Sequence, residues 1–310
     1  MGYEAEKIRR AVLAGDWGGD VWLDEPLSSH TSYRIGGPAD MLAVAGHTDR
    51  LLELLDRVRE EEIPHIVLGS GTNVLVADAG FRGMVIQNAC RGIESVHGEV
   101  LRIRAGEMMR DVARHAIELG LGGLEWAIDI PGTVGGSVIG NAGAFGGYMG
   151  DVLRRAQLLT PEGEVRWVGP EDLGLGYRTS RLKELKAEGR NCETVLSVEV
   201  LLTPTPAVLL RKTAVEYTRR RQERQPSEPS AGSVFKRTIQ YPAGFLMEQA
   251  GVKGERVGGA QVSVKHANFI VNLGGALATD VEALIDLCRE RVIEMFGIEL
   301  QLEIELVGER

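Results

Sequence analysis

The sequence of 310 residues is poor in several features that would point to particular protein classes. Its three cysteines, Cys90, Cys192 and Cys288, are odd in number and far apart, so it favours neither a disulfide framework nor a zinc site. No apolar run approaches the ~18 residues of a membrane-spanning helix, and the charged start lacks the apolar core of a signal peptide. We therefore expect a cytoplasmic protein with no metal ion and no membrane partner.

Positive charge is also scarce, because 35 lysines and arginines face 44 acidic residues and the formal net charge is −9. Nucleic-acid binding needs a basic surface, so nucleic acid is not an expected partner. A local basic pocket for a small anion stays compatible with this balance. The sequence contains no internal repeat and no low-complexity segment, and no obligatory protein partner is evident.

The chain is too long for one ordinary core, and its pattern predicts an α+β protein with two main domains. A charged helical segment at 1–31 precedes alternating helices and strands, and TPTP at 203–206 marks an extended connection. We expect a ligand-binding domain over 32–202, with two subdomains split near 86–99, and a smaller domain over 207–310.

Hydrophobic periodicity predicts the individual elements. Helices are expected at 48–62, 109–119 and 245–250, after the TPTP run as a basic helix, and as a long helix that a Thr279–Glu282 capping box begins and Gly297 ends. Strands are expected at 65–68, 73–77, 83–87, 100–105, 153–159 and 195–202, followed by two in the second domain and a closing strand at 298–307. The apolar stripe of the long helix consists of Val281, Leu284, Ile285, Cys288, Val292 and Met295.

Two glycine-rich segments stand out, LGSGTNVLVADAG at 68–80 and IPGTVGGSVIGNAGAFGG at 130–147. Both contain apolar residues, unlike a flexible linker, so we expect loops whose backbone lies close to another molecule. The first departs from the dinucleotide fingerprint, because Val74 replaces the third glycine and a strand follows. Small residues still let backbone N–H groups point at one anion, so the pair predicts a pyrophosphate-containing cofactor. The alternative interpretation is that the glycines serve only to form tight turns that need a positive φ.

Five motifs occur in order: LGSGTNVLV, IPGTVGGSVIGNAGAFG, GYRTSRLK, AGSVFKR and KHANFIVN. Together they resemble the UDP-N-acetylenolpyruvoylglucosamine reductase (UDP-N-acetylmuramate dehydrogenase) family over about 32–308. The resemblance implies an FAD-binding domain of the p-cresol methylhydroxylase type and a substrate-binding domain, in a flavoenzyme of peptidoglycan synthesis. It also implies that NADPH reduces FAD, that reduced flavin reduces the enolpyruvyl group of a UDP-sugar, and that the chain is the shorter family type, which lacks a tyrosine-bearing loop.

By this resemblance, the two glycine segments hold the FAD pyrophosphate and flank the flavin ring. The implied cofactor-binding residues are Gly69, Ser70, Gly71, Thr72, Asn73, Pro131, Gly132, Val134, Gly135, Gly136, Ser137, Asn141 and Gly143. Asp129, Ser137 and Thr238 depart from the family pattern, which has glycine, alanine and proline there. These departures bear on local geometry, not on the family.

Three residues match catalytic positions of the family. Arg178 in GYRTSRLK is expected to hold the substrate carboxylate, and Ser233 in AGSVFKR is expected to donate a proton to the substrate carbon. Counting back from Gly308 selects Glu303 as the catalytic glutamate, which would stabilise the enediolate with Arg178. Glu305 lies on the same polar face of the expected strand and is the alternative.

The same matches imply the substrate-binding residues Tyr177, Arg224, Lys236, Lys265 and His266. Arg224 belongs to the basic run RRRQERQP, whose other arginines could take its place. Two further functions stay open on the sequence: another FAD-dependent oxidoreductase of the same fold with a different substrate, and a catalytically silent flavin-binding protein. The motif AGSVFKR argues against the first, and the presence of Arg178 and Ser233 argues against the second.

Overall fold

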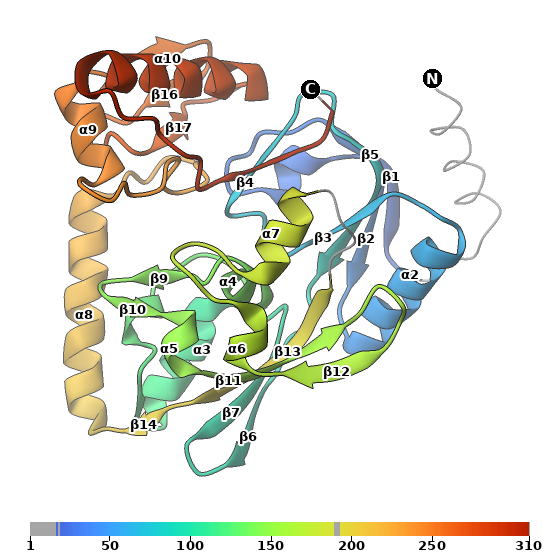
Figure 1. The fold of residues 1–310 in the computed structure, drawn as a ribbon. Helices are drawn as coiled ribbons and strands as arrows, with labels where there is room; N and C mark the ends of the chain where they lie inside the picture. The colour runs from blue at the N-terminus through green and yellow to red at the C-terminus, as the bar shows by residue number, and fades with distance from the viewer. Residues whose placement is uncertain (1–16, 18, 189–192, 310) are drawn as a thin grey trace. The chain divides into compact units, whose positions relative to one another are not determined.

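The computed structural model describes residue 17 and residues 19–188 and 193–309, so most of the helical segment expected at 1–31 lies outside the described residues. The described end of that segment forms a strand at Val21–Pro26 and a short 3-10 helix at Leu27–His30 instead of continuing a helix. The chain divides into two compact units, each assembled from separate stretches of sequence. The first unit comprises residues up to Ala43, Glu61–Val85 and Gln222–Arg310, and the second comprises Val44–Glu60 and Ile86–Arg221. Helices and strands in both units confirm the α+β class (Figure 1).

The first unit is built from short strands and two α-helices. Its strands are β1 (Val21–Pro26), β2 (Pro38–Ala45), β3 (His65–Leu68), β4 (Val74–Val76), β5 (Phe81–Asn88), β15 (Arg256–Val257), β16 (Ala260–Val262), β17 (Ile270–Asn272) and β18 (Glu305–Val307). Its helices are η1 (Leu27–His30), α9 (Ala243–Gln249) and α10 (Ala278–Phe296). The sheets have the orders β1-β2-β5-β3 and β15-β16-β17, and β18 pairs with β4 in parallel. Three strands, rather than the two expected, therefore lie between α9 and α10.

The core of the first unit forms against α10. Val281, Leu284 and Cys288 are buried there with residues of α9, β16 and β17, because spacings of three and four residues place them on one helix face. Met295 is 57% exposed, so the predicted stripe is wrong at its last member. The helix has turned Met295 away from the core by its final turn.

The predicted capping box of Thr279 and Glu282 is wrong. The helix α10 begins one residue before Thr279, and the Asp280 carboxylate accepts the N–H of Leu277 at 3.0 Å. The Asp280 carboxylate already accepts a free N–H at the helix start, so the cap forms at Leu277, two residues earlier than expected. Gly297 ends the helix with a φ of 65°, as predicted.

The closing strand at 298–307 is much shorter than predicted. Within this segment, only Glu305–Val307 forms a strand, β18, and Leu302 makes a single bridge to Phe235. The segment therefore passes from one neighbouring chain segment to another within a few residues. Each of these strand pairings is too short to form the long strand that the alternating pattern predicts.

The second unit contains a longer sheet and most of the helices. Its strands are β6 (Ile93–His97), β7 (Val100–Arg104), β8 (Leu121–Gly122), β9 (Gly143–Ala144), β10 (Gly147–Tyr148), β11 (Leu153–Leu159), β12 (Val165–Val168), β13 (Thr194–Leu201) and β14 (Thr203–Pro204). Its helices are α2 (Thr48–Glu60), α3 (Met109–Glu118), η2 (Glu125–Ala127), α4 (Val134–Ile139), α5 (Met149–Val152), α6 (Pro170–Leu173), α7 (Arg181–Ala187) and α8 (Ala207–Arg224), whose last residues belong to the first unit.

A five-stranded antiparallel sheet, β12-β11-β13-β7-β6, forms the centre of the second unit (Figure 1). Alternate residues of its strands, such as Ile103 and Val198, are buried in one core with Val134 and Val138 of α4. Successive side chains of a strand point to opposite faces, so the residues between them lie on the other face of the sheet. One face of this sheet therefore supports the second glycine segment, and the opposite face carries polar side chains.

The strands predicted at 65–68, 100–105 and 153–159 appear as β3, β7 and β11, within one residue at each end. At the TPTP run, Thr203–Pro204 pairs with β8 instead of forming a free connection. The chain stays in the second unit until Arg221, inside α8. The assignment of 32–202 to an FAD-binding domain and of 207–310 to a substrate-binding domain stays a prediction.

Candidate functional site

The first glycine segment lies in the first unit as a loop between β3 and β4. Gly71 has a φ of 62°, and its carbonyl oxygen accepts the N–H of Ser32 at 3.0 Å. A Cβ at Gly71 would lie 2.2 Å from the carbonyl oxygen of His30. The neighbouring backbone therefore requires glycine here, as the tight-turn interpretation predicts.

One polar atom in this loop has no hydrogen-bond partner among the residues that the structure describes. The hydroxyl of Ser70 is buried and forms no hydrogen bond with any residue that the structure describes. A buried hydroxyl without a partner is costly, because it has lost its bonds to water. The Ser70 hydroxyl is thus available to a ligand of this loop.

Asn73 connects the first glycine loop to the C-terminal segment. Its Nδ2 donates to the carbonyl oxygen of Glu303 at 3.2 Å, and its own carbonyl oxygen accepts the N–H of Glu305 at 2.9 Å. The loop therefore fixes the backbone that carries both candidate glutamates.

Ser233 and Glu303 lie on adjacent segments of the first unit. The N–H of Glu303 donates to the carbonyl oxygen of Val234 at 2.8 Å, and the N–H of Lys236 donates to Gln301 at 2.8 Å. Both Ser233 and Glu303 are half-buried. Two of the three predicted catalytic residues are thus brought together, although they are 70 positions apart in the numbering.

The second glycine segment, in the second unit, is only partly a loop. Residues 134–139 form the helix α4, which corrects the expectation of a glycine loop throughout. Its first N–H groups already have acceptors in the protein: Val134 donates to Glu107, Gly135 donates to Ala105, and Gly136 donates to the hydroxyl of Thr133. The anion nest expected from Gly135 and Gly136 is therefore not formed at this helix start.

The two consecutive glycines of α4 have different surroundings. A Cβ at Gly135 would lie 3.0 Å from the Cβ of Ala105, so this glycine allows α4 to pack closely on the end of β7. Gly136 is exposed, and a Cβ there would meet nothing nearer than the Thr133 hydroxyl at 3.6 Å. The protein itself has room for a side chain at Gly136.

Arg178 is held against the second glycine segment. It lies in a tight turn between Gly176 and Thr179 with a φ of 55°, and its Nη2 donates to the carbonyl oxygen of Gly143 at 2.7 Å. The Asn141 Nδ2 donates to the carbonyl oxygen of Gly176 at 2.9 Å and fixes the same turn. A positive φ at a residue other than glycine is strained, and such strain is common at functional sites. Tyr177, beside it, is 46% exposed.

The family departure at Asp129 has a defined partner on α8. The hydroxyl of Thr218 donates to the Asp129 carboxylate, and the ring of Tyr217 stacks on Phe145 with 4.3 Å between centroids. Burial lowers the pKa of Arg221, and the Asp129 charge opposes that shift. The helix is thus connected to both ends of the second glycine segment. We did not predict Tyr217 and Thr218, although the departure at Asp129 was a signal for them, whereas Arg221 belongs to the basic run that offered alternatives to Arg224.

Three of the remaining predicted substrate residues, Arg224, Lys265 and His266, lie near the end of α8, in the first unit. The Lys265 ammonium donates to the carbonyl oxygen of Gln222 at 2.6 Å, which caps the last turn of the helix. Burial lowers the pKa of His266, and the charges of Lys253 and Arg224 lower it further, so its imidazole is neutral near pH 7. Lys265 and Arg224 thus form a cationic region beside the neutral His266, with Lys265 already engaged by the protein.

No group of three or more metal-ligating side chains occurs in the described parts of the chain, 17, 19–188 and 193–309. Within the same residues, no helix is both long and apolar enough to cross a membrane.

Comparison with protein families identifies the class of protein. The model of the FAD binding domain matches residues 39–169, which include both glycine segments. The C-terminal domain of UDP-N-acetylenolpyruvoylglucosamine reductase matches residues 225–307, which include Ser233 and Glu303. The chain is therefore an FAD-binding oxidoreductase that contains an FAD-binding domain and a reductase C-terminal domain. More particularly, it belongs to the UDP-N-acetylenolpyruvoylglucosamine reductase family of peptidoglycan synthesis.

Relatives match over nearly their whole length. The chain is 42% identical over 291 residues to the UDP-N-acetylenolpyruvoylglucosamine reductase of Alkaliphilus oremlandii, covering 93% of this chain and 94% of that protein. It is 44% identical over 287 residues to that of Caldicellulosiruptor bescii, covering 92% and 90%. The crystal structure of the UDP-N-acetylenolpyruvylglucosamine reductase from Thermus caldophilus aligns with a TM-score of 0.78 and 35% identity, over 93% of this chain and 98% of that one. These matches confirm the resemblance and the expected fold.

The residues present fit an FAD molecule. In the first loop the buried Ser70 hydroxyl has no partner among the described residues, and in the second segment Gly136 leaves its surface open. Both features are those of a backbone that a cofactor approaches closely. The other predicted cofactor residues, including Gly69, Thr72 and Ser137, stay predictions.

Proposed function

We propose that this protein reduces the enolpyruvyl group of UDP-N-acetylglucosamine enolpyruvate to UDP-N-acetylmuramate in the cytoplasm, with NADPH as the reductant. The observation that supports it most directly is the pairing of the two segments that carry Ser233 and Glu303, which share the 2.8 Å hydrogen bond from the Glu303 N–H to the Val234 carbonyl oxygen. Family membership and the FAD domain support the flavin chemistry.

The reaction itself defines what the side chains must do. FAD, when bound, supplies hydride transfer from NADPH to the terminal carbon of the enolpyruvyl group. Negative charge then develops on the neighbouring carbon and its carboxylate. Arg178 is the residue for this charge, because its guanidinium is permanently positive and binds a carboxylate in two places. The tight turn and the bond to Gly143 orient it before substrate binds.

Ser233 and Glu303 supply the second half of the chemistry. A serine hydroxyl is a weak acid, so proton donation needs a site from which water is excluded and a group that stabilises the product. Ser233 is half-buried beside the segment of Glu303, which suits a donor of this kind. In this scheme Ser233 protonates the carbon and Glu303 hydrogen-bonds the enediolate. Tyr177, Lys236 and Arg224 are the proposed substrate-binding residues.

The experiment is to purify the protein with FAD and follow NADPH oxidation with and without the enolpyruvyl UDP-sugar. We expect a yellow protein, NADPH oxidation that depends on the UDP-sugar, and a product that has gained one hydride and one proton by mass spectrometry. Phosphoenolpyruvate, which has the enolpyruvyl group but no UDP-sugar, is the matched control and should not be reduced. A flavin-containing protein whose NADPH oxidation ignores the UDP-sugar would contradict the substrate while leaving the flavin chemistry intact.

A further inference from the structure

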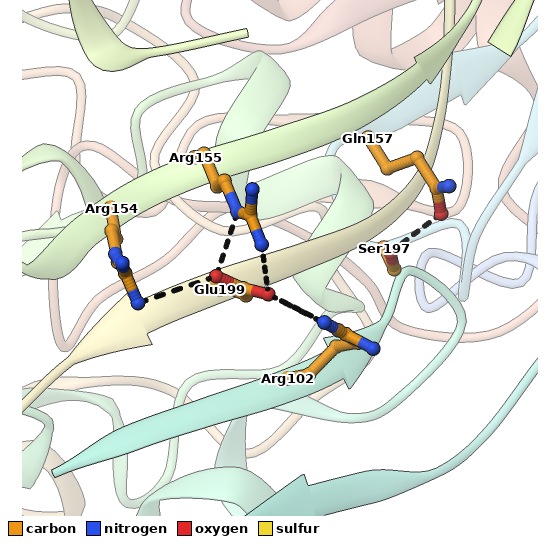
Figure 2. Close-up of polar contacts among 6 residues, drawn as sticks. All are labelled: Arg102, Arg154, Arg155, Gln157, Ser197 and Glu199. Carbon is orange, nitrogen blue, oxygen red and sulfur yellow. Dashed lines mark hydrogen bonds and ion pairs between the residues drawn. The ribbon is translucent and has the colours of Figure 1, made fainter. Parts of the chain in front are cut away.

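The polar face of the five-stranded sheet carries an arginine cluster with a buried glutamate at its centre. Glu199 on β13 is directly opposite Arg102 on β7 and Arg155 on β11 in the strand register. Its side chain is completely buried, whereas each arginine keeps about 40% of its side-chain surface exposed. Figure 2 shows the three strands side by side, with Arg154 reaching the same carboxylate.

The glutamate holds both arginines by one edge. Arg155 donates through Nε and Nη2 at 2.7 and 2.8 Å, and Arg102 donates through the same two atoms at 3.2 and 2.8 Å. The hydrogen bond from Arg155 is the main reason that the pKa of Glu199 falls to about 2. Neither Nη1 atom forms a hydrogen bond with another described residue. A planar guanidinium fixed along one edge presents its other donors in a set direction.

Positive charge exceeds negative charge on this face. Among the described residues, the ion pairs of Arg102, Arg104, Arg154 and Arg155 are with Glu94 and Glu199, so these six groups have a formal charge of +2 in a chain of −9. Holding Glu199 alone does not require so many guanidinium groups. The surplus attracts an anion from solution, and it does so more strongly at low ionic strength.

A pocket of about 230 Å³ opens beside the cluster, lined by Glu94, Arg102, Arg104, Gln157, Trp167 and Ser197. At ~30 Å³ for each water, this is room for roughly eight water molecules, enough for a phosphate group with a small organic part. The hydroxyl of Ser197 donates to Oε1 of Gln157 at 3.0 Å, so the amide nitrogen of Gln157 is left as a donor (Figure 2). The Trp167 ring has the Arg155 guanidinium 4.4 Å from its centroid. The walls thus combine cationic donors, an amide and an aromatic ring.

This pocket is separate from the glycine segment of the same unit. The residues that alternate with the cluster, Leu101, Val198 and Val200, are buried in the core that holds Val134 of α4. The sheet therefore lies between the pocket and α4. A ligand on the polar face would contact none of the residues assigned to FAD or substrate.

We propose that this pocket is a second ligand site of the protein, which binds a small phosphate ester. The phosphate is held by Arg102 and Arg104, and the organic part lies against Trp167 and the Gln157 amide. Phosphate suits the outward Nη1 donor of Arg102 and the charge of Arg104, whose own Nη1 donates to the Thr48 hydroxyl at 2.6 Å. This site is independent of the function proposed above.

The test follows the indole N–H signal of Trp167 by NMR in the FAD-loaded protein, because that signal reports on the pocket alone. The protein has four tryptophans, and the variant Trp167→Phe assigns the signal. Glycerol 3-phosphate is the probe and glycerol is the neutral control. We expect a saturable shift with the phosphate ester across the millimolar range and none with glycerol. A Trp167 signal that does not respond to glycerol 3-phosphate overturns the proposal.

Three variants separate the pocket from general charge. Arg104→Gln and Arg102→Gln should each weaken binding about tenfold or more, since each removes a charge-assisted contact. Arg166→Gln is the matched control, because Arg166 lies on β12 of the same sheet but binds Glu193 and does not line the pocket. It should bind like the native protein. Arg104 does not contact Glu199, so Arg104→Gln serves even if Arg102→Gln fails to fold. Equal binding by the native protein and Arg104→Gln, or equal weakening in Arg166→Gln, contradicts the proposal.

Discussion

In both glycine segments an asparagine side chain donates a hydrogen bond to the backbone near a predicted catalytic residue, but the two residues differ. In the first unit, Asn73 donates its side-chain amide to the backbone of Glu303. In the second unit, Asn141 donates its side-chain amide to Gly176, in the turn that carries Arg178. Each segment thus fixes the backbone beside one predicted catalytic residue as well as supplying residues expected to contact FAD. The predicted catalytic residues are thus positioned by the same short segments that contain the predicted cofactor residues.

The glycines themselves differ between the segments. Gly71 is required by its positive φ and by the carbonyl oxygen of His30, and Gly135 is required by close packing on Ala105. Gly136 meets neither constraint. Substituting glycines therefore distinguishes those that shape the protein from those that admit the cofactor, and composition alone cannot make that distinction.

The largest effect should come from the glutamate that the first segment holds. Glu303→Gln keeps the shape but removes the charge, and we expect turnover to fall on the order of 10²-fold or more. Glu305→Gln is the matched control two residues away and should change stability by at most ~0.5 kcal/mol, with turnover near native. Steady-state kinetics and urea unfolding of both variants provide the test. The reverse ranking would assign the catalytic role to Glu305.

Gly71→Val should destabilise the first unit. The new Cβ would meet the His30 carbonyl at 2.2 Å, and valine disfavours the φ of 62°. We expect a loss of roughly 2–5 kcal/mol in the free energy of unfolding. Gly135→Val should cost less, because its nearest contact is the 3.0 Å approach to the Ala105 methyl. Urea unfolding of the FAD-free proteins measures both, and equal stability of Gly71→Val and the native protein would contradict the account of this loop.

Glu199 gives the second unit a pH dependence of its own. The pKa of Glu199 is lowered from 4.5 to about 2, so its contribution to stability is full above about pH 4.5 and is lost as the pH falls towards 2. Glu199→Gln should flatten this fall in urea-unfolding midpoints. Glu216 has its pKa lowered to about 2 by Arg219 and Arg220, but this exposed pair is screened by water. Glu216→Gln should therefore flatten the curve less, and equal effects of the two substitutions would contradict the burial argument.

The smallest structural effect, and the most informative for the cofactor, should come from Gly136→Val. The protein has room for this side chain, so the unfolding midpoint should stay near native. Affinity for FAD should fall by about tenfold or more, because the side chain occupies the surface that the cofactor approaches. Flavin fluorescence during titration of the FAD-free protein measures this. Unchanged affinity would place the FAD elsewhere than against Gly136.

The sequence predicted the elements with strong periodicity and missed the contacts that depend on tertiary structure. The stripe of α10 and the turn at Gly297 follow from local spacing, so they were predictable. The alternation at 298–307 suggested a long strand, but the available partners, around Phe235 and Val74, are short and lie in different segments. The helix α4 was missed because Gly135 and Gly136 have low helix propensity, which packing on Ala105 overrides.

At the site, local motifs identified the residues but not their arrangement. Ser233 and Glu303 were selected separately, and no spacing in the sequence shows that their segments pair. The contact of Asp129 with Thr218 joins positions far apart in the chain, so only the departure from the family pattern hinted at it. The acceptors of the α4 N–H groups likewise become visible only in the folded chain.

The central claim is that Ser233 donates the proton to the substrate carbon, and stopped-flow absorbance of the flavin in Ser233→Ala tests it most directly. Reduction of FAD by NADPH requires no proton at a carbon, so the account predicts a rate near native for that half-reaction. Reoxidation by the enolpyruvyl UDP-sugar should slow by about 10²–10⁴-fold, while reoxidation by an artificial one-electron acceptor stays fast. If both half-reactions slowed together, Ser233 would instead be a structural residue of the flavin pocket, and the claim would be wrong.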